Sequence, residues 1–183
     1  MREVHIISDV NSNKEGINRN MEIRKVNLKT DLSDISLVYA KSWKHAYARI
    51  IPAQYLNELV GDKWISILSK SDREMLVLDN EGQSVGVVTF GVARDSEYSS
   101  EGELMSIYLL PEYIHKGYGT KLLKKAEIRL VELGYATIYL WVLAANNSGR
   151  NFYKQQGFHV AGNQREIEIG GSNLTEIRYI KNL

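Results

Sequence analysis

The sequence predicts a single-domain α/β protein in which helices flank a mixed sheet. Segments of strand character alternate with segments of helical periodicity along most of the 183 residues. Hydrophobic residues make up 44% of the chain, which is enough to fill one core in a domain of this length. The expected order of elements is β-αα-β-β-β-α-β-α-β-β.

The first elements are a strand and two helices. Residues 22–27 predict a short strand, and Thr30 can cap the helix that follows. Apolar residues then recur at helical spacing as far as Ile50. Pro52 separates this helix from a second one, which is expected to end at Gly61.

The remaining elements alternate more regularly. Strands at residues 75–78 and 85–92 are expected to join at a turn containing Gly82. A helix with one apolar face is expected to begin near Tyr118 and to stop at Gly134. The other predicted elements are strands at 103–110, 137–142, 158–169 and 174–181 and a helix at 148–156.

The ends and the composition of the chain limit its function. Residues 9–20 are polar, rich in Asn and without periodicity, so we expect residues 1–20 to form a partly disordered extension before a domain at 21–183. The net charge of +1 argues against nucleic acid or an anionic membrane as a partner. There is no cysteine, and the four histidines are scattered, so we expect no metal site. No transmembrane run or signal peptide is evident, and we expect a cytoplasmic protein.

A glycine-bearing loop between a strand and a helix is the clearest candidate site. Gly117 and Gly119 stand at the start of the predicted helix, where amides lack partners and the helix dipole favours an anion. Glycine also lets the backbone approach a phosphate closely. The spacing fits neither a P-loop nor a dinucleotide loop. The alternative is that the two glycines only close a turn.

Three motifs in order resemble the GNAT superfamily of acetyltransferases, which bind acetyl-CoA. The pyrophosphate loop of that family matches residues 114–119 (IHKGYG), and its later Asn, Phe-Tyr and Gly-Phe signature matches positions within 146–158. Residues 42–47 (SWKHAY) resemble the first helix of a branch that acetylates small amines and peptides. The resemblance covers about residues 21–183. Ile114 departs from the usual Gln or Arg and removes a side-chain donor.

The resemblance implies a fold and a set of cofactor contacts. The implied fold is of the α/β (α+β) class, with helices that flank a mixed, mostly antiparallel sheet. The implied co-substrate is acetyl-CoA, and no metal is required. One strand is expected to part from its neighbour and to bind the pantetheine arm through its backbone. The implied cofactor-binding residues are Ile107, Tyr108, Leu109, His115, Lys116, Gly117, Tyr118, Gly119, Thr120, Asn146 and Tyr153. Asn146 can instead serve only as a helix cap.

Catalysis requires a neutral amine and a proton for the leaving thiolate. Tyr153 is the candidate acid, and the alternative is a tyrosine that only packs in the core. Glu103 can accept a proton from the amine, directly or through water, or attract a cationic amine; the alternative is a solvated carboxylate at the end of a strand. Trp43 and Tyr47 lie four apart on one helix face and are candidate acceptor contacts, although core packing would give the same pattern.

The expected function is transfer of an acetyl group to a primary amine: a polyamine, an amino acid, a peptide or an antibiotic. A non-catalytic sensor or regulatory subunit that binds acyl-CoA is the alternative. The sequence does not identify the acceptor. It leaves the oligomeric state open, with a homodimer among the options.

Overall fold

The structure, a computed structural model, describes residues 21–69 and 73–183. In this part of the chain seven strands form one sheet in the order β1-β2-β3-β4-β5-β7-β6. Every neighbouring pair is antiparallel except β4 and β5, which are parallel. The predicted mixed, mostly antiparallel sheet is therefore confirmed. The expected extension at residues 1–20 lies outside the described residues.

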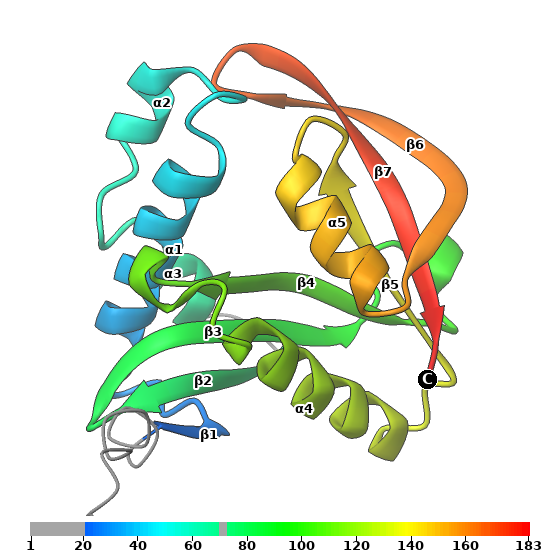
Figure 1. Cartoon of the computed structure of the whole chain (residues 1–183), viewed down its shortest axis with the longest axis horizontal. Coiled ribbons are helices and arrows are strands. Elements are labelled where there is room, and N and C mark those ends of the chain that lie inside the picture. Colours follow the sequence, from blue (N-terminus) through cyan, green and yellow to red (C-terminus); the bar gives the residue numbers. More distant parts are fainter. Residues whose placement is uncertain (1–20, 70–72) are drawn as a thin grey trace, which may run out of the picture.

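The elements follow the predicted order closely (Figure 1). The first half comprises β1 (Met21–Lys25), α1 (Leu32–Ala46), α2 (Ala53–Asn57), α3 (Ile65–Ser69), β2 (Glu74–Asn80), β3 (Gln83–Val92) and the 3-10 turn η1 (Ser96–Tyr98). The second half comprises β4 (Gly102–Leu109), the 3-10 turn η2 (Pro111–Tyr113), α4 (Tyr118–Glu132), β5 (Thr137–Leu143), α5 (Asn147–Gln155), β6 (His159–Ile169) and β7 (Ser172–Asn182).

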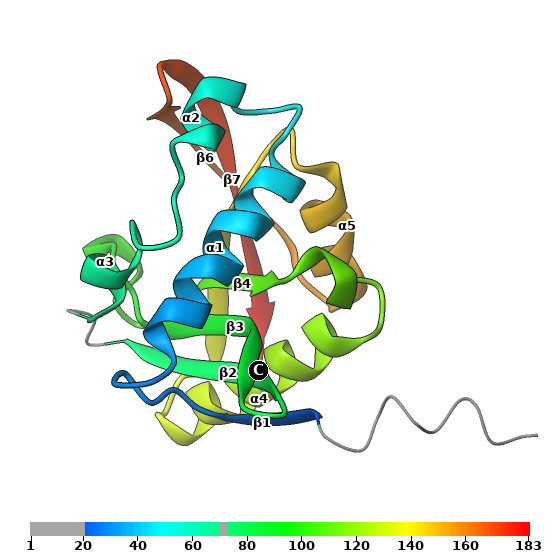
Figure 2. The ribbon, with the colours of Figure 1, turned by 90° about the vertical axis from the view of Figure 1, so that its left-hand side faces the viewer.

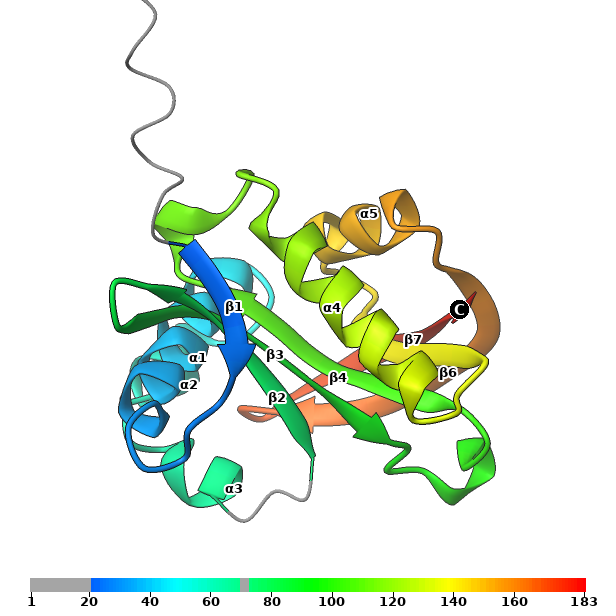
Figure 3. The same cartoon turned by 90° about the horizontal axis from the view of Figure 1, so that it is seen from below.

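The helices cover both faces of the sheet. Helices α1, α2 and α3 lie on one side, and α4 and α5 lie on the other (Figures 2 and 3). The β6–β7 hairpin forms one edge of the sheet, and its tip lies near α2 (Figure 1). At its tip Gly170 has φ +60°, and a Cβ there would lie 2.7 Å from the Cβ of Tyr55, so the hairpin and α2 are in close contact. None of the helices in the described ranges is long and apolar enough to cross a membrane.

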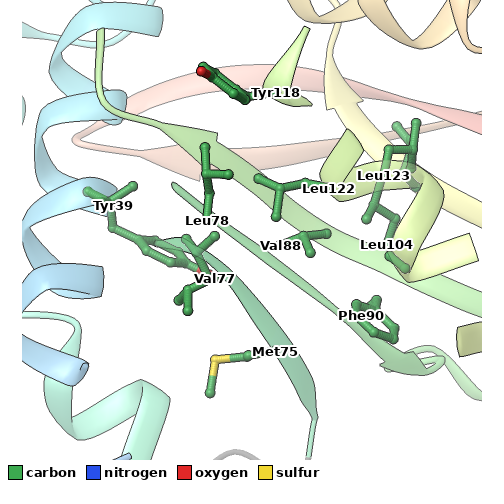
Figure 4. Close-up of a cluster of buried hydrophobic side chains, with 14 of the residues drawn as sticks. Tyr39, Met75, Val77, Leu78, Val88, Phe90, Leu104, Tyr118, Leu122 and Leu123 are labelled. Atoms are coloured by element: carbon green, nitrogen blue, oxygen red, sulfur yellow. The ribbon is translucent and has the colours of Figure 1, made fainter. Parts of the chain in front are cut away.

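The main core lies on both sides of β3, which is buried from residue 84 to residue 91. On one side Leu104 of β4 packs near Leu122 and Leu123 of α4, and on the other Tyr39 of α1 lies against Val77 (Figure 4). A strand covered on both faces is expected to be apolar throughout, as this one is. The core therefore fixes the position of β4 relative to α1 and α4, between which the candidate site lies.

The structure corrects both predicted boundaries of the first helix. Helix α1 ends at Ala46 rather than near Ile50, because the chain turns at Tyr47, whose carbonyl accepts from the amides of both Ile50 and Ile51. The N-cap is Asp31 and not Thr30. In the sequence, the apolar residues of the helix are followed without a break by apolar turn residues, which pack into a second hydrophobic cluster. The helical pattern of the sequence therefore continues to Ile50.

A further correction concerns the segment between α1 and β2. One helix ending at Gly61 was expected, but two short helices, α2 and α3, lie there. Each has five residues, too few to produce a recognisable periodic pattern in the sequence.

Candidate active site

The parallel strands β4 and β5 part soon after they begin. They share only two register positions, Gly102 with Ile138 and Glu103 with Tyr139, although β4 has eight residues and β5 has seven. The register of β4 with β3 shifts nearby, which leaves Met105 as a bulge. A gap therefore opens toward the carboxyl ends of both strands, the usual place for a ligand at a parallel pair.

Backbone groups of β4 face this gap. The amide of Leu110 donates to the carbonyl of Val85, so the backbone amide of Leu110 points toward β3. Hydrogen-bonding direction alternates along an antiparallel pair, so the amides of Ile107 and Leu109 point away from β3. At these positions β4 is no longer paired with β5, so the two amides face the gap. The amide of Tyr108 points toward β3. Two of the three predicted backbone positions thus face the gap.

The predicted glycine loop lies beyond the end of β4. His115 has φ +59° and Gly117 has φ +80°, so the chain reverses sharply before α4 begins at Tyr118. A Cβ added to Gly117 would meet nothing within 4 Å, which shows open space at the helix start. Within the described residues, the amides of residues 115–120 donate to no protein acceptor. The loop therefore presents a run of free N–H donors at a helix N-terminus.

Side chains around the loop bring it next to α5. A Cβ on Gly119 would lie 3.4 Å from the ring of Phe152, so the first turn of α4 contacts α5 closely. The Lys116 ammonium lies 5.7 Å from the Tyr113 ring centre, and the Lys121 ammonium lies 5.4 Å from that of Tyr118. These two cations supply positive charge beside the donors, where Ile114 supplies none.

Tyrosine side chains gather where the strands have parted. Burial raises the pKa of Tyr153 well above its ordinary value, and the neighbouring Tyr47 raises it further. Burial likewise raises the pKa of Tyr108, which interacts with Tyr47 and Tyr153. The structure thus brings together Tyr47, Tyr108 and Tyr153, from three separate segments of the sequence. All three phenols are neutral near pH 7 and can donate a proton or a hydrogen bond.

Asn146 has the geometry of a helix cap. Its side-chain oxygen accepts from the amide of Gly149 at 3.0 Å at the start of α5. Asn146 also forms a hydrogen bond with the Tyr47 hydroxyl. Burial raises the pKa of Tyr47, and this hydrogen bond opposes only part of that rise. Capping and a position in the tyrosine cluster are therefore compatible in this residue.

Glu103 is buried, and Arg94 binds its carboxylate. Only 2% of the residue is exposed. The Nε of Arg94 donates to Oε1 at 2.9 Å, its Nη2 to Oε1 at 2.5 Å, and its backbone amide to Oε2 at 2.8 Å. These hydrogen bonds raise the pKa of the guanidinium. The carboxylate is therefore already occupied by protein donors.

Trp43 and Tyr47 belong to a row of aromatic rings. Their ring centres are 5.1 Å apart, and Trp43 lies 5.4 Å from Trp64. Trp64 in turn lies 5.0 Å from Tyr39, which lies 4.8 Å from Tyr108. Trp43 thus packs within this row, whereas Tyr47 at the end of α1 also contributes its hydroxyl to the tyrosine cluster.

A cleft of about 350 Å³ lies beside Glu103. Its lining residues come from the segment after β3, from the start of η1, from the start of β4, and from β5 and β6: Arg94, Asp95, Ser96, Glu103, Tyr139, Trp141 and Arg165. Because Glu103 and Tyr139 also form the last shared register position of β4 and β5, the cleft lies at the closed end of the gap.

Sequence reasoning missed Arg94, Trp64, Trp141 and Arg165. Arg94 follows β3 and Glu103 lies near the start of β4, so an antiparallel pairing of these strands could have suggested their contact. Trp64 and Arg165 carry no comparable local signal, because the contacts they make join distant segments.

Comparison with known proteins identifies the family. Residues 38–158, more than half of the chain, match the model of the acetyltransferase (GNAT) family. The N-acetyltransferase YuaI of Bacillus subtilis, itself uncharacterized, is 32% identical over 165 residues, which cover 83% of this chain and 94% of the relative. The chain belongs to the GNAT family and is an acetyl-CoA-dependent acyltransferase.

Two comparisons with Thermoplasma acidophilum add detail. Its spermidine N(1)-acetyltransferase is 31% identical over 147 residues, which cover 76% of this chain and 89% of the relative. The solved structure of its PaiA N-acetyltransferase in complex with coenzyme A has a TM-score of 0.67 at 27% identity and covers 89% of this chain and 99% of that one. A coenzyme A complex in so similar a fold supports acetyl-CoA as the co-substrate here.

Proposed function

We propose that this protein moves the acetyl group of acetyl-CoA to a primary amine that attacks the thioester directly. The observation that carries the proposal is the gap between β4 and β5 beside the glycine loop. A diphosphate fits the free amides of residues 115–120, and the space at Gly117 has no Cβ to block it. Lys116 and Lys121 add positive charge next to these amides.

The β4 backbone is suited to hold the rest of the co-substrate. The amides of Ile107 and Leu109 can donate to the pantetheine arm or to the thioester carbonyl. As the amine attacks, negative charge builds on that carbonyl oxygen, and a fixed N–H stabilises it. Bound acetyl-CoA supplies the activated acetyl group, and the protein supplies the orientation.

Tyr153 is proposed as the general acid. The phenol is protonated at neutral pH and lies in the tyrosine cluster where the strands have parted, so it can give its proton to the departing thiolate. Tyr47 and Tyr108 lie in the same cluster and can orient that hydroxyl. Asn146 is proposed to contact the pantetheine arm while it caps α5.

Glu103 is proposed to act on the amine through water. Its ion pair with Arg94 occupies both carboxylate oxygens, so direct contact with the amine would require Arg94 to move. A water molecule in the adjoining cleft can carry the proton without that movement. Trp43 and Tyr47 are proposed to line the acceptor side, with Tyr47 nearer to the tyrosine cluster.

The acceptor classes to test are polyamines, amino acids, peptides and aminoglycoside antibiotics. The name of the spermidine-acetylating relative makes spermidine the first compound to test. Relatives named as N-acetyltransferases favour transfer over the alternative of an acyl-CoA sensor. The experiment is steady-state release of free thiol from acetyl-CoA with this panel of amines. Thiol release that depends on an amine supports the proposal, and its absence with every amine would contradict it.

A further inference from the structure

Two exposed guanidinium groups border the cleft beside Glu103, and the carboxylates that pair with them are largely buried. The side chains of Arg94 and Arg165 are 47% and 40% exposed, whereas those of their partners Glu103 and Glu176 are 2% and 16% exposed. Each carboxylate thus lies beneath a guanidinium. A molecule that enters the cleft therefore meets guanidinium N–H donors before it meets the oxygens of Glu103 and Glu176. The carboxylate of Asp95 also lines the cleft and is partly exposed, and its Oδ1 already accepts from the amide of Glu97.

Arg165 is held with part of its donor set free. Its Nε donates to Glu176 at 2.8 Å, and its Nη2 lies 2.7 Å from the same oxygen. Its guanidinium lies over the Trp141 ring, 4.2 Å from the ring centre. Among the residues that the structure describes, Nη1 has no acceptor. The ion pair and the ring fix the plane of the group and leave these N–H bonds available.

Arg94 is arranged in the same way on the opposite wall. Its Nε and Nη2 both bind Glu103, and Nη1 has no acceptor in the described part of the chain. Two planar guanidinium groups with their orientation already fixed therefore border one cleft. Such groups match the geometry of carboxylate and phosphate oxygens better than an ammonium would.

We propose that this cleft binds an oxyanion carried by the acceptor, so that the preferred acceptors are amines with an acid group at their far end. The inference rests on the proposed function, because it names the acceptor class for that reaction. The site lies at the closed end of the β4–β5 gap, so an acceptor held there can extend its amine toward the thioester. Trp141 and Tyr139 provide an apolar wall for the intervening carbon chain.

A polyamine fits this cleft less well. Its distal ammonium would face two exposed guanidinium groups, which repel it, and Asp95 is the one carboxylate among the described lining residues that is partly exposed to pair with it. The carboxylates beneath them reduce the net field of the cleft but leave the direction of the N–H donors unchanged. Selectivity would therefore come from directed hydrogen bonds at short range rather than from long-range attraction.

The test compares amines of equal length that differ in one end group. Short ω-amino acids are each measured beside the matching diamine and the matching alkylamine, and aminoalkyl phosphonates replace the carboxylate in a second series. The ratio of kcat/KM for the acid-bearing amine to that for the alkylamine is the readout. We expect this ratio to favour the acid and to fall by about tenfold to a hundredfold in Arg165→Gln, the usual worth of a hydrogen bond to a charged group. The series with the larger ratio identifies carboxylate or phosphate as the natural group.

Two further variants guard against a general loss of structure. Arg165→Lys keeps the charge but not the planar fork, so it should restore only part of the preference. Arg129→Gln is the matched control, because Arg129 is 33% exposed and pairs with Glu74 on another part of the molecule. It should leave the ratio unchanged. Preference for the diamine, or a ratio that Arg165→Gln does not change, would overturn the inference.

Binding measurements separate this inference from the proposed function. If no amine in the panel gives thiol release, the proposed function fails, and calorimetry with aminopentanoate then judges the cleft alone. If aminopentanoate binds the wild type and its affinity falls at least tenfold in Arg165→Gln, the result supports an oxyanion site. Absence of binding, or equal affinity in the two proteins, contradicts it.

Discussion

Glu103 of β4 lies opposite Tyr139 of β5, and this is the last register position that the two parallel strands share. On one side of the pair is the cleft that Arg94 and Arg165 border, and beyond it the strands separate toward the glycine loop. One pair of residues therefore marks the boundary between the proposed acceptor region and the proposed co-substrate gap.

The Glu103–Arg94 ion pair should respond unequally to removal of its two partners. Arg94→Gln leaves a carboxylate that is 2% exposed without its cation, whereas Glu103→Gln leaves a guanidinium that is 47% exposed. We expect Arg94→Gln to lower the free energy of unfolding more, because an uncompensated buried charge is costly. Urea denaturation of both single variants and of the double variant measures this, and the double variant should recover part of the loss.

The Glu74–Arg129 pair provides the control for that comparison. Both side chains are about one-third exposed, at 29% and 33%, so removal of either partner should have a small and similar effect. Equal losses from Arg94→Gln and Glu103→Gln would show that burial of Glu103 does not determine the energetics of its ion pair.

Gly119→Asp should abolish binding of acetyl-CoA while the protein stays folded. A Cβ at this position would lie 3.4 Å from the Phe152 ring, which the backbone can accommodate with a small shift. The added carboxylate would repel the diphosphate at the free amides of the loop. Calorimetric titration measures the affinity, and circular dichroism checks the fold.

Gly61→Asp is the matched control for this prediction. A Cβ there would meet nothing within 4 Å, and Gly61 lies in the turn after α2, away from the loop. It should bind acetyl-CoA like the wild type. Unchanged affinity in a folded Gly119→Asp protein would refute the proposed diphosphate site.

Deletion of residues 1–20 should leave both turnover and stability unchanged. Residues 9–20 lack a periodic apolar face, so nothing in the sequence suggests that this segment docks on the domain. Thiol release and the melting temperature of the shortened protein test this. A marked fall in either quantity would show that the segment contributes to the domain.

The sequence predicted those parts of the fold that depend on local pattern. The long periodic helix α4, the buried strand β3 and the loop at Gly117 were all visible in the order of residues. The short helices α2 and α3 were not resolved, because five residues cannot establish a helical period. The end of α1 was misplaced because apolar turn residues continued its stripe.

The candidate site was predictable where motifs are contiguous and less so where contacts are long-range. The tyrosine cluster unites Tyr47, Tyr108 and Tyr153, which were each selected separately and without any expectation of contact. The partners of Glu103 and Trp141 were missed, because Arg94 and Arg165 reach them only after the sheet has assembled. Side-chain pairing across a sheet depends on register, which a single sequence determines poorly.

Tyr153→Phe tests the proposed acid most directly, since it keeps the ring that packs 5.7 Å from Phe158 and removes only the hydroxyl. We expect kcat to fall by about 10²–10⁴-fold, the usual contribution of a positioned acid. Affinity for acetyl-CoA should change little, because the proton is shared mainly in the transition state. Tyr135→Phe, on the turn after α4, is the control for loss of a tyrosine hydroxyl. If Tyr153 served only in packing, the variant would keep kcat within a few-fold of the wild type, and the proton would then have to come from solvent or from Tyr47 or Tyr108.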